Sequence, residues 1–240
     1  MNGPDGTDGG NGNESADAAS GNEVSVDAAV ESVRETYDRI ADHFSTTREH
    51  PWPQIPAFLD GREGAVGPAV GCGNGRHVEP LAERCDRTVG LDLSRALLDI
   101  AVDRAGKRGV PAAWLQGDAA RLPLRRDGVD LALYVATLHH LPTAAARRAS
   151  LDELARVLAP DGSALVSAWS TTHDRFDAEH GFDTVVDWTL PGGETVPRYY
   201  HIYDPEEFAD DLGASGLAVE RTFTDRGNCF AVVHGEGKRT

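Results

Sequence analysis

Short apolar runs alternate with amphipathic stretches through most of the chain. The apolar runs predict strands at 66–70, 88–92, 112–116, 129–135 and 163–169. Apolar positions at helical spacing predict helices at 75–84, 95–107 and 143–158. Because strands that alternate with helices form parallel βαβ units, the pattern predicts an α/β fold with a doubly wound, mostly parallel sheet.

Further elements flank this alternating region. A first helix is predicted from Val30, Val33, Tyr37, Ile40 and Phe44, with Ser25 or Asp27 as its cap, and the Pro-Trp-Pro at 51–53 ends it. A short helix follows at 55–59. At the other end we expect a helix at 205–213 and strands at 217–224 and 228–233, joined by a hairpin turn at 225–227.

Two segments do not fit the alternation. Residues 1–23 are Gly, Asn, Asp, Ser and Ala without aromatic or basic residues, and we expect a disordered acidic tail. Residues 170–203 are rich in aromatic residues and are predicted to be an irregular insertion or lid. Residues 24–240 then form one domain, which is consistent with the chain length of 240 residues.

A glycine-rich turn follows the first predicted strand. Gly71, Gly73 and Gly75 alternate with Cys72 and Asn74 in a G-x-G-x-G pattern. A strand that turns through glycines into a helix brings backbone N–H groups close to a ligand. The spacing differs from that of dinucleotide and phosphate-binding loops, and most turns of this kind are only turns.

Polar residues stand at the ends of the other predicted strands. Asp92 ends the second and is placed to accept hydrogen bonds from ribose hydroxyls; Asp118 follows the third and could accept from an adenine amino group, beside the Ala119 N–H. Thr137, His139 and His140 follow the fourth. Ligands of open α/β sheets bind at the carboxyl ends of the strands, so these residues are expected to meet in one site.

Composition limits the function. The formal net charge is −16, and the chain has only two lysines, as expected of a halophilic protein. Such a charge opposes nucleic-acid binding at ordinary ionic strength, although molar salt screens it. The three cysteines lack C-x-x-C spacing and predict neither a disulfide framework nor a metal site. Without a signal peptide or a long apolar run, we expect a cytoplasmic protein with no membrane contact.

The motifs resemble those of class I S-adenosylmethionine-dependent methyltransferases, which have a Rossmann-like seven-stranded sheet of order 3-2-1-4-5-7-6 with the last strand antiparallel. The resemblance rests on GCGNG (71–75), GLDLS (90–94), QGDAARLP (116–123), ATLHHL (136–141) and RVLAPDG (156–162). The family usually has an acidic residue where this chain has Ala69, so another group would have to brace the loop. The cofactor S-adenosyl-L-methionine is expected to contact Tyr37, Gly71, Cys72, Gly73, Asn74, Gly75, Asp92, Leu93, Asp118, Ala119 and Ala136.

Two further segments resemble the wobble-uridine tRNA carboxymethyl methyltransferases. They are YDRIADHFSTTREHPWPQIPAFL (37–59) and PRYYHIYDPEEF (197–208), and the paired arginines Arg147 and Arg148 fit as well. This likeness implies methyl-ester formation on uridine 34 in the anticodon loop of tRNA, with no DNA substrate. It also implies a small zinc-binding activator protein as a partner.

A carboxylate acceptor needs no strong general base, because its pKa is near 4 and it is ionised at neutral pH. Arg198 is the first candidate for positioning such an acceptor, and Arg48 is the second. Tyr199 and Tyr200 either stack a base or pack in the core. His139 and His201 complete the candidate catalytic set of His139, Arg198, Tyr199 and His201; with a carboxylate acceptor, His139 is expected to shape the pocket rather than act as a base.

Two other functions stay open. One is methylation of a quinone-like small molecule, since the same core serves both substrate classes. The other is a catalytically inactive partner protein, because of Ala69. Arginines 48, 147, 148 and 198 converging on one open basic face would favour RNA, whereas a closed apolar cavity would favour the small molecule.

Overall fold

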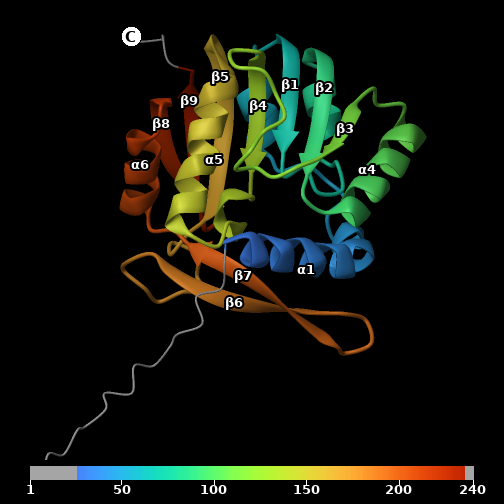
Figure 1. The fold of residues 1–240 in the computed structure, drawn as a ribbon, viewed down its shortest axis with the longest axis vertical. Helices are drawn as coiled ribbons and strands as arrows, with labels where there is room; N and C mark the ends of the chain where they lie inside the picture. Colours follow the sequence, from blue (N-terminus) through green and yellow to red (C-terminus); the bar gives the residue numbers. More distant parts are fainter. Residues whose placement is uncertain (1–25, 236–240) are drawn as a thin grey trace, which may run out of the picture.

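The computed structural model describes residues 26–235, so the predicted tail at 1–23 lies outside the described residues. Seven strands form one sheet in the order β3-β2-β1-β4-β5-β9-β8 (Figure 1). The first five are parallel, and β9 is antiparallel to both its neighbours. This confirms the predicted fold and strand order. The strands are β1 (Gly64–Val70), β2 (Cys85–Asp92), β3 (Ala113–Gln116), β4 (Val129–Val135), β5 (Leu158–Trp169), β8 (Ala218–Asp225) and β9 (Asn228–His234).

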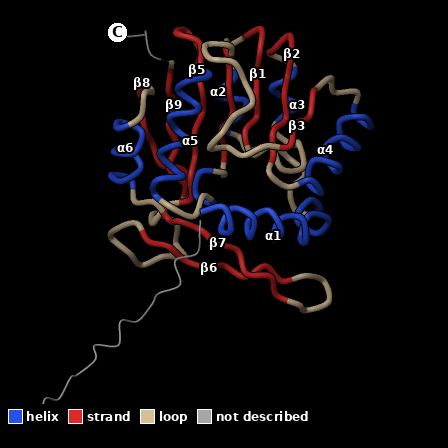
Figure 2. The backbone as a smooth tube through the Cα atoms, viewed as in Figure 1, coloured by secondary structure: helices blue, strands red, loops and turns tan. Residues whose placement is uncertain are grey.

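Helices cover both faces of this sheet (Figure 2). Strand β4 shows why, since Ala132 and Tyr134 pack on one face while Leu131 and Leu133 pack on the other. The first face holds α5 and α6, and the second holds α2, α3 and α4. The helices are α1 (Val26–Thr46), α2 (Gln54–Leu59), α3 (Val78–Ala82), α4 (Arg95–Arg108), α5 (Ala144–Val157) and α6 (Pro205–Ala214), with a 3-10 turn η1 (Leu138–His140).

Strand β1 lies in the centre of the sheet although it contains Pro68, which cannot donate to a neighbouring strand. At the start of the strand, the Oδ2 of Asp130 accepts from the N–H groups of Ala65 (3.0 Å) and Val66 (2.9 Å). A carboxylate of β4 therefore holds the first residues of β1 in addition to the backbone pairing of Ala69 with Leu133.

The segment 170–203 is not irregular, and this part of the sequence prediction was wrong. It contains a β-hairpin of β6 (Phe182–Thr189) and β7 (Thr195–Ile202). The partners Val186 and Arg198 are buried, whereas Asp187 and Pro197, which follow and precede them along their strands, are exposed, as in a half-buried two-stranded sheet. The hairpin and α1 lie across the carboxyl-end edge of the main sheet (Figure 1).

Other differences are smaller. The helix predicted at 75–84 is only α3, because Gly75 takes a left-handed conformation (φ 78°) and residues 75–77 form a turn. The turn between β8 and β9 is confirmed, with positive φ at Arg226 and Gly227. Within the described residues, no helix is long and apolar enough to cross a membrane.

Candidate functional site

A cavity of about 470 Å³ opens where the parallel strands end. Its floor comes from the loops after β1, β2, β3 and β4. Helix α1 and strand β7 of the hairpin form its walls. The strand ends leave backbone groups unpaired there, as expected for a ligand site in an open α/β sheet.

The glycine turn approaches this cavity through Gly71 and Gly73, both in the left-handed region (φ 64° and 54°). A Cβ on Gly71 would overlap the side chain of Thr137, which donates to the carbonyls of Val70 (3.3 Å) and Gly71 (3.4 Å). Glycine is therefore needed at position 71 for space as well as for φ.

Asp92 braces the glycine turn. Its Oδ2 accepts from the Gly73 N–H at 2.7 Å, and its Oδ1 accepts from the Ser94 N–H at 2.9 Å. Burial raises the pKa of this carboxyl to about 6, although the two N–H donors oppose that shift. A carboxylate has lone pairs for further donors, so the same group can still accept from ligand hydroxyls. Asp92 thus supplies the bracing that Ala69 cannot provide.

The structure places Asp118 in the same cavity as Asp92. In the β2–β3 pairing Asp92 stands opposite Gln116, and the Gly117 N–H donates to the Asp92 carbonyl at 3.0 Å. Asp118 turns back to accept from the Ala120 N–H at 2.8 Å. Leu93, Ala119 and Ala136 also line this end of the cavity.

Three predicted cofactor contacts do not line the cavity. Cys72 is buried in the hydrophobic core, and burial raises the pKa of its thiol. The Asn74 side chain donates to the carbonyls of Ser45 (3.4 Å) and Arg48 (2.9 Å), which ties the turn to the end of α1. Gly75 packs against Ala101 and the Trp114 ring. These three residues therefore support the glycine turn through contacts outside the cavity.

Arg198 enters the cavity from β7 and is only 8% exposed. Its guanidinium lies over the rings of Trp188 (4.7 Å) and Tyr200 (5.1 Å), and its Nη1 donates to the Tyr200 hydroxyl at 2.5 Å. Its Nε has no hydrogen-bond partner, and no carboxylate lies within 4.0 Å of it in residues 26–235. A buried cation without a counter-charge is costly unless a ligand supplies one.

His139 and His140 line the cavity, but in each ring the nitrogen lone pair that could serve as a base already accepts a hydrogen bond. The Nδ1 of His139 accepts from the Trp169 N–H at 2.8 Å, so the proton of the neutral ring is on Nε2. The Nδ1 of His140 donates to the Tyr199 carbonyl at 3.3 Å, so its Nε2 accepts from the Tyr37 hydroxyl at 2.8 Å.

Both rings are neutral at physiological pH. Burial and the nearby His140 and Arg198 hold the pKa of His139 well below its usual range. Burial lowers the pKa of His140 to about 3. His139 can therefore donate a hydrogen bond through Nε2–H to a ligand, while His140 holds Tyr37 in place on α1.

Arg48 lies at the edge of the cavity, over the rings of Phe44 (5.2 Å) and Trp188 (5.7 Å). Trp188 therefore contacts both Arg48 and Arg198. Trp188 belongs to the segment 170–203, for which the sequence predicts only an aromatic-rich insertion or lid.

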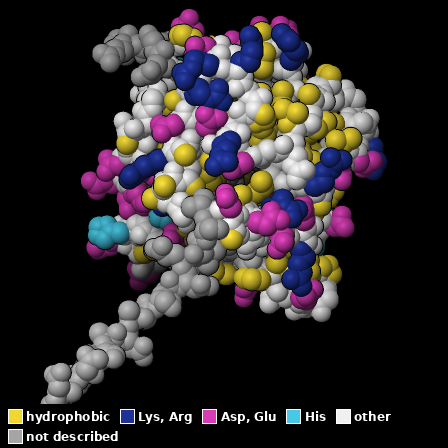
Figure 3. All heavy atoms as spheres, in the orientation of Figure 1, with side chains coloured by type: hydrophobic (Ala, Val, Ile, Leu, Met, Phe, Trp, Pro, Cys, Tyr) yellow, Lys and Arg dark blue, Asp and Glu magenta, His cyan; other side chains and the backbone are white. Residues whose placement is uncertain are grey.

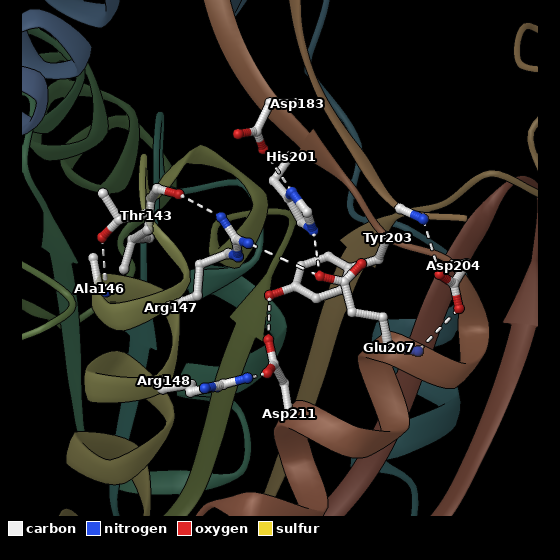
Figure 4. Close-up of polar contacts among 12 residues, drawn as sticks. Thr143, Ala146, Arg147, Arg148, Asp183, His201, Tyr203, Asp204, Glu207 and Asp211 are labelled. Atoms are coloured by element: carbon white, nitrogen blue, oxygen red, sulfur yellow. Dashed lines mark hydrogen bonds and ion pairs between the residues drawn. The ribbon is translucent and has the colours of Figure 1, made fainter. Parts of the chain in front are cut away.

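Tyr199 and His201, two predicted catalytic residues, do not reach the cavity. Successive residues of a strand point to opposite sides, so Tyr199 points away from the side that carries Arg198 and Tyr200. Its hydroxyl donates to Asp183 at 2.7 Å. His201 lies between Asp183 (2.7 Å) and Glu207 (2.9 Å) (Figure 4) and does not line the cavity.

Arg147 and Arg148 also lie in this network rather than beside the cavity. Arg147 is buried and lies 3.9 Å from Glu207, and Arg148 pairs with Asp211 at 3.0 Å (Figure 4). The expected basic face of four arginines is therefore not formed. Only Arg48 and Arg198 of the four line the cavity.

Asp38 is a residue that the sequence analysis missed. It accepts from the Ser94 hydroxyl (2.6 Å) and the Ala96 N–H (3.0 Å), and it pairs with Arg34 at 2.7 Å. These bonds fasten α1 to the start of α4 and so close one wall of the cavity. The i, i+4 spacing of Arg34 and Asp38 was the available signal.

Known proteins give an independent comparison. Residues 69–166 match a family model described as a methyltransferase domain. A putative methyltransferase from Encephalitozoon cuniculi is 33% identical over 210 residues, which is 84% of this chain and 94% of that protein. The tRNA (carboxymethyluridine(34)-5-O)-methyltransferase of Arabidopsis thaliana is 37% identical over 143 residues, 59% of this chain and 33% of that protein.

A solved structure shares the fold. It is the complex between the Haloferax volcanii Trm112 methyltransferase activator and the putative methyltransferase, which matches with a TM-score of 0.65 and 17% identity over 87% of this chain and 99% of that one. The chain spans only a fifth to a third of the length of the plant and vertebrate tRNA (carboxymethyluridine(34)-5-O)-methyltransferases.

Proposed function

Because the chain belongs to the class I S-adenosylmethionine-dependent methyltransferases, we propose that it methylates a carboxylate, namely the 5-carboxymethyl group on the wobble uridine of tRNA. The observation that carries this proposal is Arg198, a buried guanidinium in the cavity without an acidic partner among the described residues. Relatives at 30–38% identity that are known as tRNA (carboxymethyluridine(34)-5-O)-methyltransferases support this substrate.

The cofactor fits the end of the cavity built by the glycine turn. Asp92 would accept from the ribose hydroxyls, and Asp118 and the Ala119 N–H would meet the adenine. Gly71 and Gly73 allow close approach of the methionine part. When bound, S-adenosylmethionine supplies an electrophilic methyl group on a sulfonium.

The acceptor carboxylate would lie against Arg198, with the Nε2–H of His139 donating a second hydrogen bond. A carboxylate is already ionised at neutral pH, so the site needs no base. This agrees with the histidines, whose Nδ1 or Nε2 lone pairs are occupied. Arg198 positions the acceptor by charge. The hairpin and α1 exclude water, and orientation and desolvation provide the acceleration.

The other two functions are less well supported. A neutral quinone-like acceptor would leave Arg198 buried without a counter-charge, and a phenol acceptor would need a base. An inactive scaffold was suggested by Ala69, but Asp92 braces the turn in its place.

We also propose a small zinc-binding activator protein as a partner. In the Haloferax volcanii structure, a methyltransferase of this fold is in complex with the Trm112 methyltransferase activator. Strand β3 is an edge of the sheet, and apolar side chains gather over β2 and β3 between α4 and α5 (Figure 3). Val102 on α4 is 48% exposed. An exposed sheet edge beside an apolar patch is the surface to test first.

The test is deletion of the gene followed by mass spectrometry of tRNA nucleosides. We expect the methyl ester at the wobble uridine to disappear and free 5-carboxymethyluridine to accumulate. Complementation with the wild-type chain should restore the ester, whereas Arg198→Met should not. An unchanged nucleoside profile in the deletion strain would refute the proposed substrate.

A further inference from the structure

We infer that the mouth of the cavity is a phosphate-binding rim, formed by Arg48, Arg76, Arg175 and Arg226, that holds the backbone of single-stranded RNA beside the methylated nucleotide. This inference rests on the proposed function, because it names how the RNA part of the substrate is bound.

The first argument is the local charge. The whole chain carries a net charge of −16, yet six arginines line this one cavity and only two acidic residues, Asp92 and Asp118, do so. Both acidic residues lie at the strand ends, where the nucleoside of the cofactor would bind. On the face shown in Figure 3, basic and acidic side chains are interspersed. An RNA strand would therefore meet a locally positive rim on an otherwise repulsive protein.

The second argument is that the rim arginines keep their charge available. Arg34 pairs with Glu31 and Asp38. By contrast, no carboxylate lies within 4.0 Å of the four rim arginines in the part of the chain that the structure describes. Arg175 and Arg226 are exposed, and Arg48 and Arg76 are partly exposed. Their guanidinium groups can reach phosphate oxygens in solution.

The third argument is the aromatic support of the rim. Arg76 lies over the Trp52 ring at 5.5 Å, and Arg48 lies over Phe44 and Trp188. Burial, together with the nearby charges of Arg48 and Arg104, lowers the pKa of Arg76 to about 10. Two arginines held this close repel each other, and a bound phosphate would relieve that repulsion. Alternating arginines and aromatic rings are typical of surfaces that bind unpaired RNA.

The four rim arginines come from four separate segments. They follow α1, the glycine turn, β5 and β8 respectively. Only the tertiary fold brings them to one opening, around the passage that leads to Arg198. The outer side of the β6–β7 hairpin presents Asp183 and Asp187 instead, which excludes it as the RNA-binding surface.

The test compares Arg175→Ala/Arg226→Ala with Arg87→Ala, a control at the amino end of β2, away from the cavity. The two rim side chains are exposed, so their removal should not disturb packing. Binding of a fluorescent anticodon stem-loop RNA is measured by anisotropy between 0.1 and 1 M salt. Each lost phosphate contact should reduce the slope of log affinity against log salt by about 0.7. The double variant should therefore bind roughly 25-fold more weakly at 0.1 M salt.

A second readout separates this inference from the proposed function. Methylation of free 5-carboxymethyluridine, which has no phosphate, should proceed in the double variant as in the wild type. An unchanged salt slope and RNA affinity in the double variant would overturn the rim. If the slope falls but the wild type methylates neither RNA nor nucleoside, the rim stands and the proposed reaction fails.

Discussion

Two arginines are buried within residues 26–235, and they should respond in opposite ways to the same substitution. Arg198 is 8% exposed and Arg147 is 4% exposed. Arg147 has an acidic neighbour, since its Nη2 lies 3.9 Å from Glu207, and its Nη1 donates to the Leu141 carbonyl at 3.4 Å. Arg198 has no such acidic partner within residues 26–235, and its charge is available for a ligand.

Methionine has a similar length and no charge, so Arg198→Met removes the charge and keeps most of the volume. The loss of the Tyr200 hydrogen bond and the two ring contacts costs about 2–4 kcal/mol. Removing a buried, unpaired cation with an unsatisfied N–H also stabilises the folded state by several kcal/mol, which offsets this loss. We therefore expect the free energy of unfolding to change by less than about 2 kcal/mol.

Activity should respond much more strongly. Truncating one partner of a buried charge pair costs about 2–5 kcal/mol of binding, which corresponds to a loss of roughly 30- to 5000-fold in kcat/KM for the carboxylate acceptor. Cofactor affinity should stay within about twofold, because Asp92 and Asp118 are unchanged. Arg147→Met should instead destabilise the fold by about 1–3 kcal/mol and leave kcat/KM of the folded fraction unchanged.

The assays are thermal unfolding, calorimetry with S-adenosylmethionine and methylation kinetics on the same preparations. The reasoning is refuted if Arg198→Met loses as much stability as Arg147→Met while its folded fraction keeps wild-type kcat/KM. In that case Arg198 is a structural residue and the cavity is not built for an anion.

Three further outcomes are expected. The pKa of Asp92 is raised to about 6 and ligand hydroxyls bind its ionised form, so cofactor affinity by calorimetry should fall by up to tenfold per pH unit below about 6, and this dependence should vanish in Asp92→Asn. Because His139 is neutral and donates, kcat should be level between about pH 6.5 and 9, and a rising limb near 7 would indicate a base instead. Gly71→Ala should abolish cofactor binding because the new Cβ would overlap Thr137. Gly109 also has a positive φ but has open space around it, so Gly109→Ala should lower the free energy of unfolding, measured by chemical denaturation, by only about 1–2 kcal/mol.

The sequence pattern was enough to predict which strand ends meet at the proposed cofactor site. Gly71, Asp92 and Asp118 each follow a predicted strand, and parallel strands place their carboxyl ends along one edge of a sheet. Local pattern and topology were therefore enough to bring these three residues together. The strand order, by contrast, was predicted only through the family resemblance.

The hairpin at 182–202 was not predicted, for a physical reason. An isolated pair of strands has little stability of its own and here depends on packing against α1 and the sheet edge. Its sequence pattern is correspondingly weak, and the aromatic residues indicated a lid without giving its form.

Only the tertiary structure decided which arginines and histidines can act on a ligand. Arg147 and Arg198 both look like candidate substrate residues in the sequence, yet the fold gives one an acidic neighbour and leaves the other without one. Likewise the proton position on His139 is fixed by the Trp169 N–H, thirty residues away in the chain. Charge availability and tautomer depend on contacts between distant segments, and these contacts exist only once the chain has folded.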